Sequence, residues 1–142
     1  MTPEEARRRL VRARVGRLAT VRRDGSPHVV PFVFAIVEIG SEIRAYWIVD
    51  DKPKRSPFLR RIENIETNPS VEFVIDEYWD DWDRLWWVRA SGTGRVVHAS
   101  NERAMALEAL GEKYPQYRGS PHSGAVVAID IERISAWEAG AG

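Results

Sequence analysis

The sequence predicts a small β-barrel of six strands, with three short helices at the connections between them. Short runs rich in β-branched residues recur along the chain and are bounded by glycine, proline and aspartate turn signals. Three other segments combine a capping residue with apolar residues at helical spacing. No repeat, low-complexity segment or linker divides the 142 residues, so we expect one domain, 1–142.

The composition excludes several classes of protein. With 44% hydrophobic and 30% charged residues, the chain is typical of a globular protein. Its 21 basic and 21 acidic residues give no net charge, which argues against a nucleic-acid binder. The absence of cysteine excludes disulfides, thiolate metal sites and a cysteine nucleophile. No apolar run approaches the roughly 20 residues of a membrane span, and the charged N-terminus does not resemble a signal peptide, so we expect a cytoplasmic protein.

The N-terminal segment has the pattern of a capped helix. Thr2 is followed by Pro3 and, three residues on, by Glu5, which is a capping-box pattern. We expect a helix from Pro3 to about Arg14. Its inward residues are predicted to be Ala6, Leu10 and Val11.

Three strands are predicted next, over residues 15–21, 28–40 and 42–50. Asp24 and Gly25 form a strong hairpin signal between the first two, and we expect an antiparallel meander. Pro31 lies inside the second strand. Because proline cannot donate to a ladder, Pro31 indicates an edge, a bulge or a break that faces a ligand.

The second half of the chain alternates helices and strands. The expected elements are a helix from Ser56-Pro57 to near Asn68-Pro69, strands 70–79 and 85–99, a helix capped by Ser100 and running to about Tyr114, and a closing strand 124–137. In the last helix the predicted inward residues are Met105, Ala109 and Leu110. The two glycines of SGTGR (91–95) predict a bulge or a close approach of another strand.

A local concentration of positive charge lies between the third strand and the second helix. The five cations are Lys52, Lys54, Arg55, Arg60 and Arg61. Beside the N-terminus of a helix, such cations favour a phosphate or carboxylate site. The alternative is a solvated loop followed by the wet face of the helix, which is the usual role of a run of charges.

Tryptophans and carboxylates are concentrated in residues 76–89. The segment contains Trp79, Trp82, Trp86 and Trp87 among five carboxylates. Aromatic residues interleaved with charges favour a subunit interface or the rim of a pocket, and no glycine or histidine pattern supports a metal loop. The three histidines match no metal spacing and no hydrolase motif is present, so we assign no metal site and no catalytic residue.

Three stretches together resemble a known family. VGRLATVRRDGSPHVVPFVF, then KPKR with LRRIENIETNPSVEFVIDEY, then LWWVRASGTGRVV are similar to the pyridoxamine 5′-phosphate oxidase-like split barrels that bind flavins and deazaflavins. The resemblance is strongest to the branch that uses coenzyme F420, and it extends from about Val15 to Trp137. It implies a six-stranded antiparallel split barrel that forms a homodimer, with a cofactor in each of two clefts between the subunits.

The resemblance also assigns cofactor-binding residues. The cofactor ring would lie against Pro31, Phe32, Val33 and Phe34. The cofactor chain and phosphate would face Ile48, Val49, Lys52, Lys54 and Arg55. Arg60 and Arg61 could approach the acidic tail of a deazaflavin or be solvated, and Trp79 would come from the partner subunit.

The implied reaction is hydride transfer between F420 and a small organic acceptor, for which Tyr46, Tyr78 or a water could donate a proton. Two alternatives remain open. One is an FMN-dependent oxidase or reductase on the same fold. The other is a non-catalytic module that binds a cofactor or a tetrapyrrole, with His28 and His98 as possible ligands.

Overall fold

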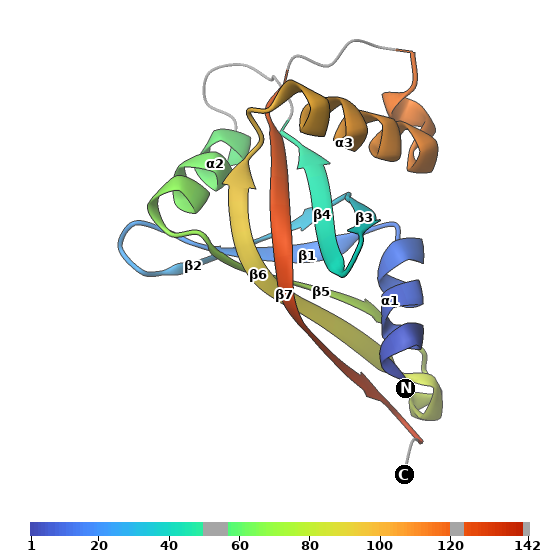
Figure 1. The fold of residues 1–142 in the computed structure, drawn as a ribbon. Helices are drawn as coiled ribbons and strands as arrows, with labels where there is room; N and C mark the ends of the chain where they lie inside the picture. Colours follow the sequence, from blue (N-terminus) through green and yellow to red (C-terminus); the bar gives the residue numbers. More distant parts are fainter. Residues whose placement is uncertain (50–56, 120–123, 141–142) are drawn as a thin grey trace.

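The structure is a computed structural model that describes residues 1–49, 57–119 and 124–140, without the side chains of 57–60. Within these residues an antiparallel sheet of seven strands is flanked by three α-helices (Figure 1). The strands are β1 (Gly16–Val21), β2 (Pro27–Phe32), β3 (Ala35–Ile39), β4 (Glu42–Ile48), β5 (Ser70–Glu77), β6 (Trp86–Val96) and β7 (Val126–Glu138). The helices are α1 (Pro3–Arg12), α2 (Pro57–Thr67) and α3 (Ser100–Lys113), with short 3-10 turns η1 (Trp82–Arg84) and η2 (Pro115–Tyr117).

The sheet is curled but not closed. Its strand order is β2-β1-β5-β6-β7-β4-β3, so β2 and β3 lie at opposite edges. Only Val33 and Phe34 separate the end of β2 from the start of β3. Three Cα–Cα steps span at most roughly 11 Å. The two edges must therefore approach each other at this point, which makes the sheet an open, split barrel.

This connection corrects two predictions. The expected strand 28–40 is two strands, β2 and β3, which raises the strand count from six to seven. The predicted meander is also wrong there, because β2 pairs with β1 while β3 pairs with β4. A single strand is excluded because the chain passes from one sheet edge to the other at Val33 and Phe34.

Two turn signals are confirmed. At the β1–β2 hairpin, the Ser26 N–H donates to Asp24 Oδ1 at 2.9 Å, and Gly25 has a φ of 88°. Pro31 lies on the edge strand β2, opposite Arg17. The outer side of an edge strand has no neighbouring strand, so a residue without an N–H is tolerated there.

The glycine pair of SGTGR is also explained. The β6–β7 register shifts at Ser91/Gly92, which confirms the bulge. A Cβ at Gly92 would collide with the carbonyl oxygen of Asp130, so the close approach of β7 requires glycine.

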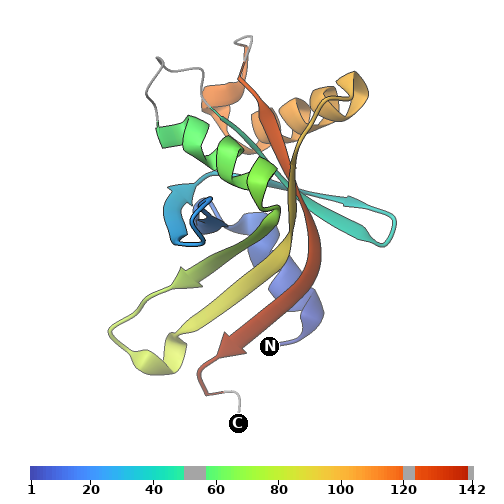
Figure 2. The same ribbon diagram turned by 90° about the vertical axis from the view of Figure 1, so that its left-hand side faces the viewer.

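The core fills the interior of the curled sheet. Phe34 stacks on Phe32 with ring centroids 4.9 Å apart, and Phe32 contacts Trp47 edge-on at 5.6 Å. A second apolar cluster lies between α3 and the sheet and includes Tyr46 and Leu110. Figures 1 and 2 place α2 and α3 toward one end of the molecule and the β5–β6 hairpin with η1 toward the other.

The helix predictions hold in part. Thr2 Oγ1 accepts from the Glu5 N–H at 3.1 Å, which confirms the cap of α1. Val11 is 44% exposed, so its predicted inward position is wrong. In α3, Ser100 is the first helical residue rather than the cap, which is Ala99.

The inward side of α3 is displaced by one residue from the prediction. Leu110 is buried as expected, and so is Ala106, whereas Met105 and Ala109 are half-buried. Among the helices that the structure describes, none is long and apolar enough to cross a membrane.

Candidate functional site

A cavity of about 270 Å³ lies where the ends of β2 and β4 approach α2 and η2. Its lining residues are Val15, Pro31, Phe32, Val33, Trp47, Ile48, Arg61 and Tyr117. Four of the predicted cofactor-binding residues are therefore brought together here: Pro31, Phe32, Val33 and Ile48.

The apolar wall of the cavity is set by the split in the sheet. Phe32 is 5% exposed because its ring packs into the core, whereas Val33 is 37% exposed. Pro31 is also exposed. The end of an edge strand thus presents a short apolar surface that the rest of the sheet leaves uncovered.

Arg61 supplies a positive charge to this cavity. It lies on α2, which is held against β1 by the buried hydrogen bond from Asn64 Nδ2 to Thr20 Oγ1 at 3.1 Å. Arg61 is 6% exposed, and this burial lowers its pKa from the ordinary value. Guanidinium nevertheless stays protonated in proteins. The interpretation of Arg61 as part of a wet helix face is therefore wrong, because its side chain is buried at the cavity.

Trp47 supplies a hydrogen-bond donor that no sequence signal indicates. Its side chain is 2% exposed, and its Nε1–H is buried without a hydrogen-bond partner among the described residues. Leaving a buried donor unsatisfied costs about 1–3 kcal/mol. Trp47 is a lining residue of the cavity, and a buried donor of this kind calls for a partner, which a bound ligand or a water would supply.

Three of the predicted site residues lie away from the cavity. Phe34 is fully buried in the core. Val49 is 3% exposed, and its N–H donates to the Ala125 carbonyl at 2.8 Å. Trp79 lies between β5 and η1, with the Arg84 guanidinium 3.5 Å from its ring centroid. The β5–β6 hairpin that contains η1 is at the end of the molecule opposite α2 (Figure 2).

The remaining predicted residues lie outside what the structure describes. These are Lys52, Lys54, Arg55 and the side chain of Arg60. Their assignment to a phosphate or an acidic tail stays a prediction.

The C-terminal end of α3 holds the linker between β2 and β3, which is Val33 and Phe34, beside the cavity. The Phe34 N–H donates to the Tyr114 hydroxyl at 3.2 Å. That hydroxyl lies 2.9 Å from the Phe34 carbonyl oxygen and 3.0 Å from that of Arg14, so its one proton is donated to either. Lys113 Nζ donates to the Phe34 carbonyl at 2.9 Å and lies 4.4 Å from the ring centroid. Both backbone groups of Phe34 are thus held by the last residue of α3 and by Tyr114, which follows it, and this fixes the neighbouring Val33 in the cavity wall.

The surroundings of Lys113 destabilise the charged form of its side chain. Burial first, and repulsion from Arg14 second, lower the pKa of Lys113 to about 8. The sequence does not predict this clamp, because it joins residues about 80 positions apart and leaves no local pattern.

A polar network fastens α3 to the outer side of β4, β6 and β7. Arg95 donates to both carboxylate oxygens of Glu102 at 2.8 Å and to Asp130 at 2.7 Å. Tyr46 donates its hydroxyl hydrogen to Glu102 at 2.7 Å. The hydrogen bonds from Arg95, with a further one from Tyr46, outweigh the effect of burial and lower the pKa of Glu102 to about 2. None of these residues lines the cavity.

Neither tyrosine considered as a proton donor lies at the cavity. Tyr46 belongs to the network with Glu102, and Tyr78 is 67% exposed beyond β5. Tyr117 is the tyrosine that lines it. In the described part of the chain, no group of three or more histidine, aspartate or glutamate residues could hold a metal ion.

The curled sheet, split between β2 and β3 with a cavity at the split, defines a split β-barrel. The sequence pattern of the pyridoxamine 5′-phosphate oxidase family matches residues 2–138. The chain therefore belongs to this family. A comparison with curated protein sequences found no match.

Solved structures share the fold at low sequence identity. A conserved hypothetical protein from Mycobacterium tuberculosis is 22% identical with a TM-score of 0.75, over 97% of this chain and 85% of its own. A FAD-binding protein from Mesorhizobium loti is 24% identical with a TM-score of 0.66, over 96% and 94%. A heme binding protein from Mycobacterium smegmatis is 19% identical with a TM-score of 0.73, over 100% of this chain but 57% of its own.

Proposed function

We propose that the protein is an oxidoreductase that transfers a hydride between coenzyme F420 and a small organic acceptor. The observation that carries the proposal is the orphaned Trp47 N–H in an apolar cavity that also contains the buried Arg61. Membership of the pyridoxamine 5′-phosphate oxidase family supports the assignment of these residues to a redox cofactor with a planar ring.

The lining residues fit the planar part of such a cofactor. The cavity, at about 270 Å³, lies just below the roughly 300–1,000 Å³ of complete ligand sites, so it suits a ring rather than a whole cofactor. Pro31 and Val33 offer apolar contact to a ring face. The Trp47 N–H would donate to a ring carbonyl or nitrogen, and the Arg61 guanidinium would stabilise negative charge on the ring or its substituents.

The cation-rich stretch favours a deazaflavin with an acidic tail. Lys52, Lys54 and Arg55 immediately precede α2, the helix that carries Arg61. Five cations over residues 51–61 exceed the number that one phosphate requires. On this proposal the three loop cations contact the phosphate, and Arg60 lies nearer the tail.

When bound, F420 supplies the hydride chemistry, while the protein contributes position and surroundings. The apolar wall excludes water from one face of the ring. The clamp of Phe34 by Lys113 and Tyr114 keeps this wall in place. Orientation of the acceptor against a fixed ring would then lower the entropic part of the barrier.

A homodimer would complete the open side of each site. The proposal is supported by three large aromatic side chains that are exposed around the β5–β6 hairpin and the end of β7: Tyr78 at 67%, Trp82 at 68% and Trp137 at 45%. Aromatic residues of this kind are enriched in interfaces. Trp79, from the same hairpin, would border the cleft of the partner subunit.

Cofactor titrations test this function. We expect F420 to quench the intrinsic tryptophan fluorescence of the purified protein and to bind more tightly than FMN. In Trp47→Phe, loss of one hydrogen bond should weaken F420 binding by about three- to tenfold. The control is Thr93→Val, which also removes one hydrogen-bond donor, because Thr93 lies on β6 and does not line the cavity. Tight binding of FMN without any response to F420 would refute the choice of cofactor.

Two alternatives rest on the named similarities. An FMN or FAD enzyme would be yellow as purified, in line with the FAD-binding protein from Mesorhizobium loti. A haem-binding module would shift the Soret band on haem titration, in line with the heme binding protein from Mycobacterium smegmatis. Neither His28 nor His98 lines the cavity, so a haem held there would need another ligand.

A further inference from the structure

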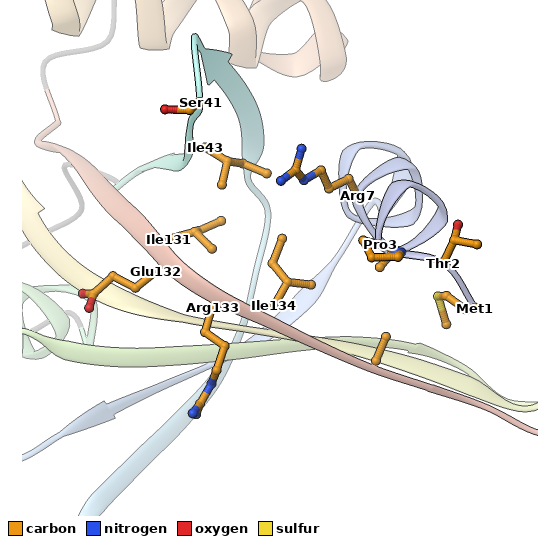
Figure 3. Close-up of a pocket in the computed structure, with 12 residues that line it drawn as sticks. Met1, Thr2, Pro3, Arg7, Ser41, Ile43, Ile131, Glu132, Arg133 and Ile134 are labelled. Atoms are coloured by element: carbon orange, nitrogen blue, oxygen red, sulfur yellow. The ribbon is translucent and has the colours of Figure 1, made fainter.

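A second cavity lies on the other side of the molecule, between α1, the start of β4 and β7 (Figure 3). Its volume is about 420 Å³, within the range of small-molecule sites. It shares no lining residue with the candidate cofactor site. Ile43 lines this cavity and Trp47 lines the other, and these two residues lie four positions apart on β4, which is roughly 13 Å along the strand.

The floor of this cavity is apolar. Three isoleucines line it, Ile43 from β4 and Ile131 and Ile134 from β7. Figure 3 shows their side chains pointing into the space below α1. Ile43 is 9% exposed, while the two β7 residues are half-buried. Apolar area of this kind favours a hydrocarbon ligand, since burying it removes surface from water.

Arg7 differs from the other arginines of residues 7–14. Arg8 and Arg9 donate to Glu5, Arg12 lies 3.6 Å from the same carboxylate, and Arg14 lies over the ring of Tyr114. Arg7 makes no ion pair, side-chain hydrogen bond or ring contact within the described part of the chain. Figure 3 shows its guanidinium extending from α1 toward Ile43.

Two carboxylates on the β7 side of this cavity are already engaged. Glu138 pairs with Arg9 at 3.1 Å and with the Met1 amine at 3.3 Å. Glu132, which lines the cavity, accepts a hydrogen bond from Thr93. Arg133 is a second cation of the lining, but in Figure 3 it extends away from the isoleucines. The charge that faces the apolar floor is therefore that of Arg7.

We propose that this cavity binds a small amphipathic carboxylate, such as a medium-chain fatty acid. The carboxylate pairs with the Arg7 guanidinium, whose planar fork matches two carboxylate oxygens. The hydrocarbon chain lies on Ile43, Ile131 and Ile134. A single cation above an apolar floor suits one carboxylate better than a multiply charged phosphate.

Calorimetric titration with sodium decanoate below its micellar concentration tests the site. We expect saturable binding to the wild-type protein and about three- to fivefold weaker binding to Arg7→Gln, because the ion pair that is lost is formed by an exposed guanidinium. Arg12→Gln is the matched control, since Arg12 is on the same helix but does not line this cavity, and its affinity should stay within about twofold. Decyltrimethylammonium, with the same chain and the opposite charge, should not bind.

A second variant tests the floor independently. Ile134→Glu places a carboxylate among the isoleucines and should abolish decanoate binding, with the fold checked by circular dichroism. Equal affinities of Arg7→Gln and the wild type, or equal binding of the cationic analogue, would overturn the proposal. The titration is carried out without F420, so its outcome is independent of the cofactor assignment.

Discussion

Replacing Tyr114 by phenylalanine tests whether the linker between β2 and β3 is held from α3. The change removes one hydroxyl and leaves the ring in place. The Phe34 carbonyl keeps its hydrogen bond from Lys113 at 2.9 Å, but the Phe34 N–H loses the acceptor that lies at 3.2 Å. Phe34 is fully buried, so water cannot replace that acceptor without opening the core.

The expected cost follows from this one orphaned donor. A buried donor left unsatisfied costs about 1–3 kcal/mol. For a chain of this length, 1 kcal/mol shifts the melting temperature by about 3–4 °C, so we expect Tm to fall by roughly 3–12 °C. Urea unfolding followed by circular dichroism gives the change in free energy directly.

Tyr78→Phe is the matched control for this experiment. The Tyr78 hydroxyl accepts a hydrogen bond from Trp82 Nε1 at 3.4 Å, but Tyr78 is 67% exposed. Its loss should change the free energy of unfolding by less than about 0.5 kcal/mol. If Tyr114→Phe were equally neutral, the reasoning that α3 anchors the linker through this hydroxyl would be refuted.

Three further predictions concern ionisation and the orphaned donor. The pKa of Lys113 is about 8 in the folded protein, below the 10.5 of the unfolded chain. Between pH 8 and 10.5 unfolding therefore takes up a proton, so the free energy of unfolding should rise with pH in this range. Thermal melts should show this rise in the wild type and not in Lys113→Met. The pKa of Glu102 is about 2 in the folded protein, below the 4.5 of the unfolded chain. Its contribution to stability is therefore complete above pH 4.5 and is lost as the pH falls toward 2. In an acid titration, the stability of Glu102→Gln should fall less steeply than that of the wild type. Trp47→Phe should weaken cofactor binding and also lower Tm by several degrees, because the smaller ring leaves a cavity around a side chain that is 2% exposed; unchanged cofactor affinity in the folded variant would refute the role of the indole N–H.

Local signals predicted much of the fold. The cap at Thr2, the Asp24-Gly25 turn and the bulge at Gly92 each depend on residues close in sequence, and all three are present. Pro31 correctly indicated an edge strand, because a missing backbone donor restricts where a residue can lie in any sheet.

The split at Val33 and Phe34 could not be predicted in the same way. The segment 28–40 is mostly apolar and rich in β-branched residues, so its composition favours one long strand. The break is imposed by the curling of the sheet and by Tyr114, which lies 80 residues away from Phe34. No periodicity within the segment records a constraint from so far along the chain.

The candidate site could likewise be predicted only in part. The resemblance identified Pro31, Phe32, Val33 and Ile48, which the fold does bring together. It did not identify Trp47, whose place in an alternating strand indicates an ordinary core residue. Arg61 was also left open, because a cation in a charged run gives no sign of which arginine faces inward. Its burial depends on how α2 rotates against β1, which is decided by Asn64 and Ile65 rather than by the run of charges.

The position of the linker, Val33 and Phe34, sets the width of the cavity. A sheet whose edges are joined by two residues can open or close at that point, and the width of the cavity depends on where Val33 lies. Lys113 and Tyr114 set that position from α3, and α3 is fastened to β4, β6 and β7 through Glu102. Loosening α3 should therefore widen the cavity before it unfolds the barrel. Glu102→Gln should then weaken cofactor binding even at neutral pH, where the carboxylate network of the wild type is fully formed.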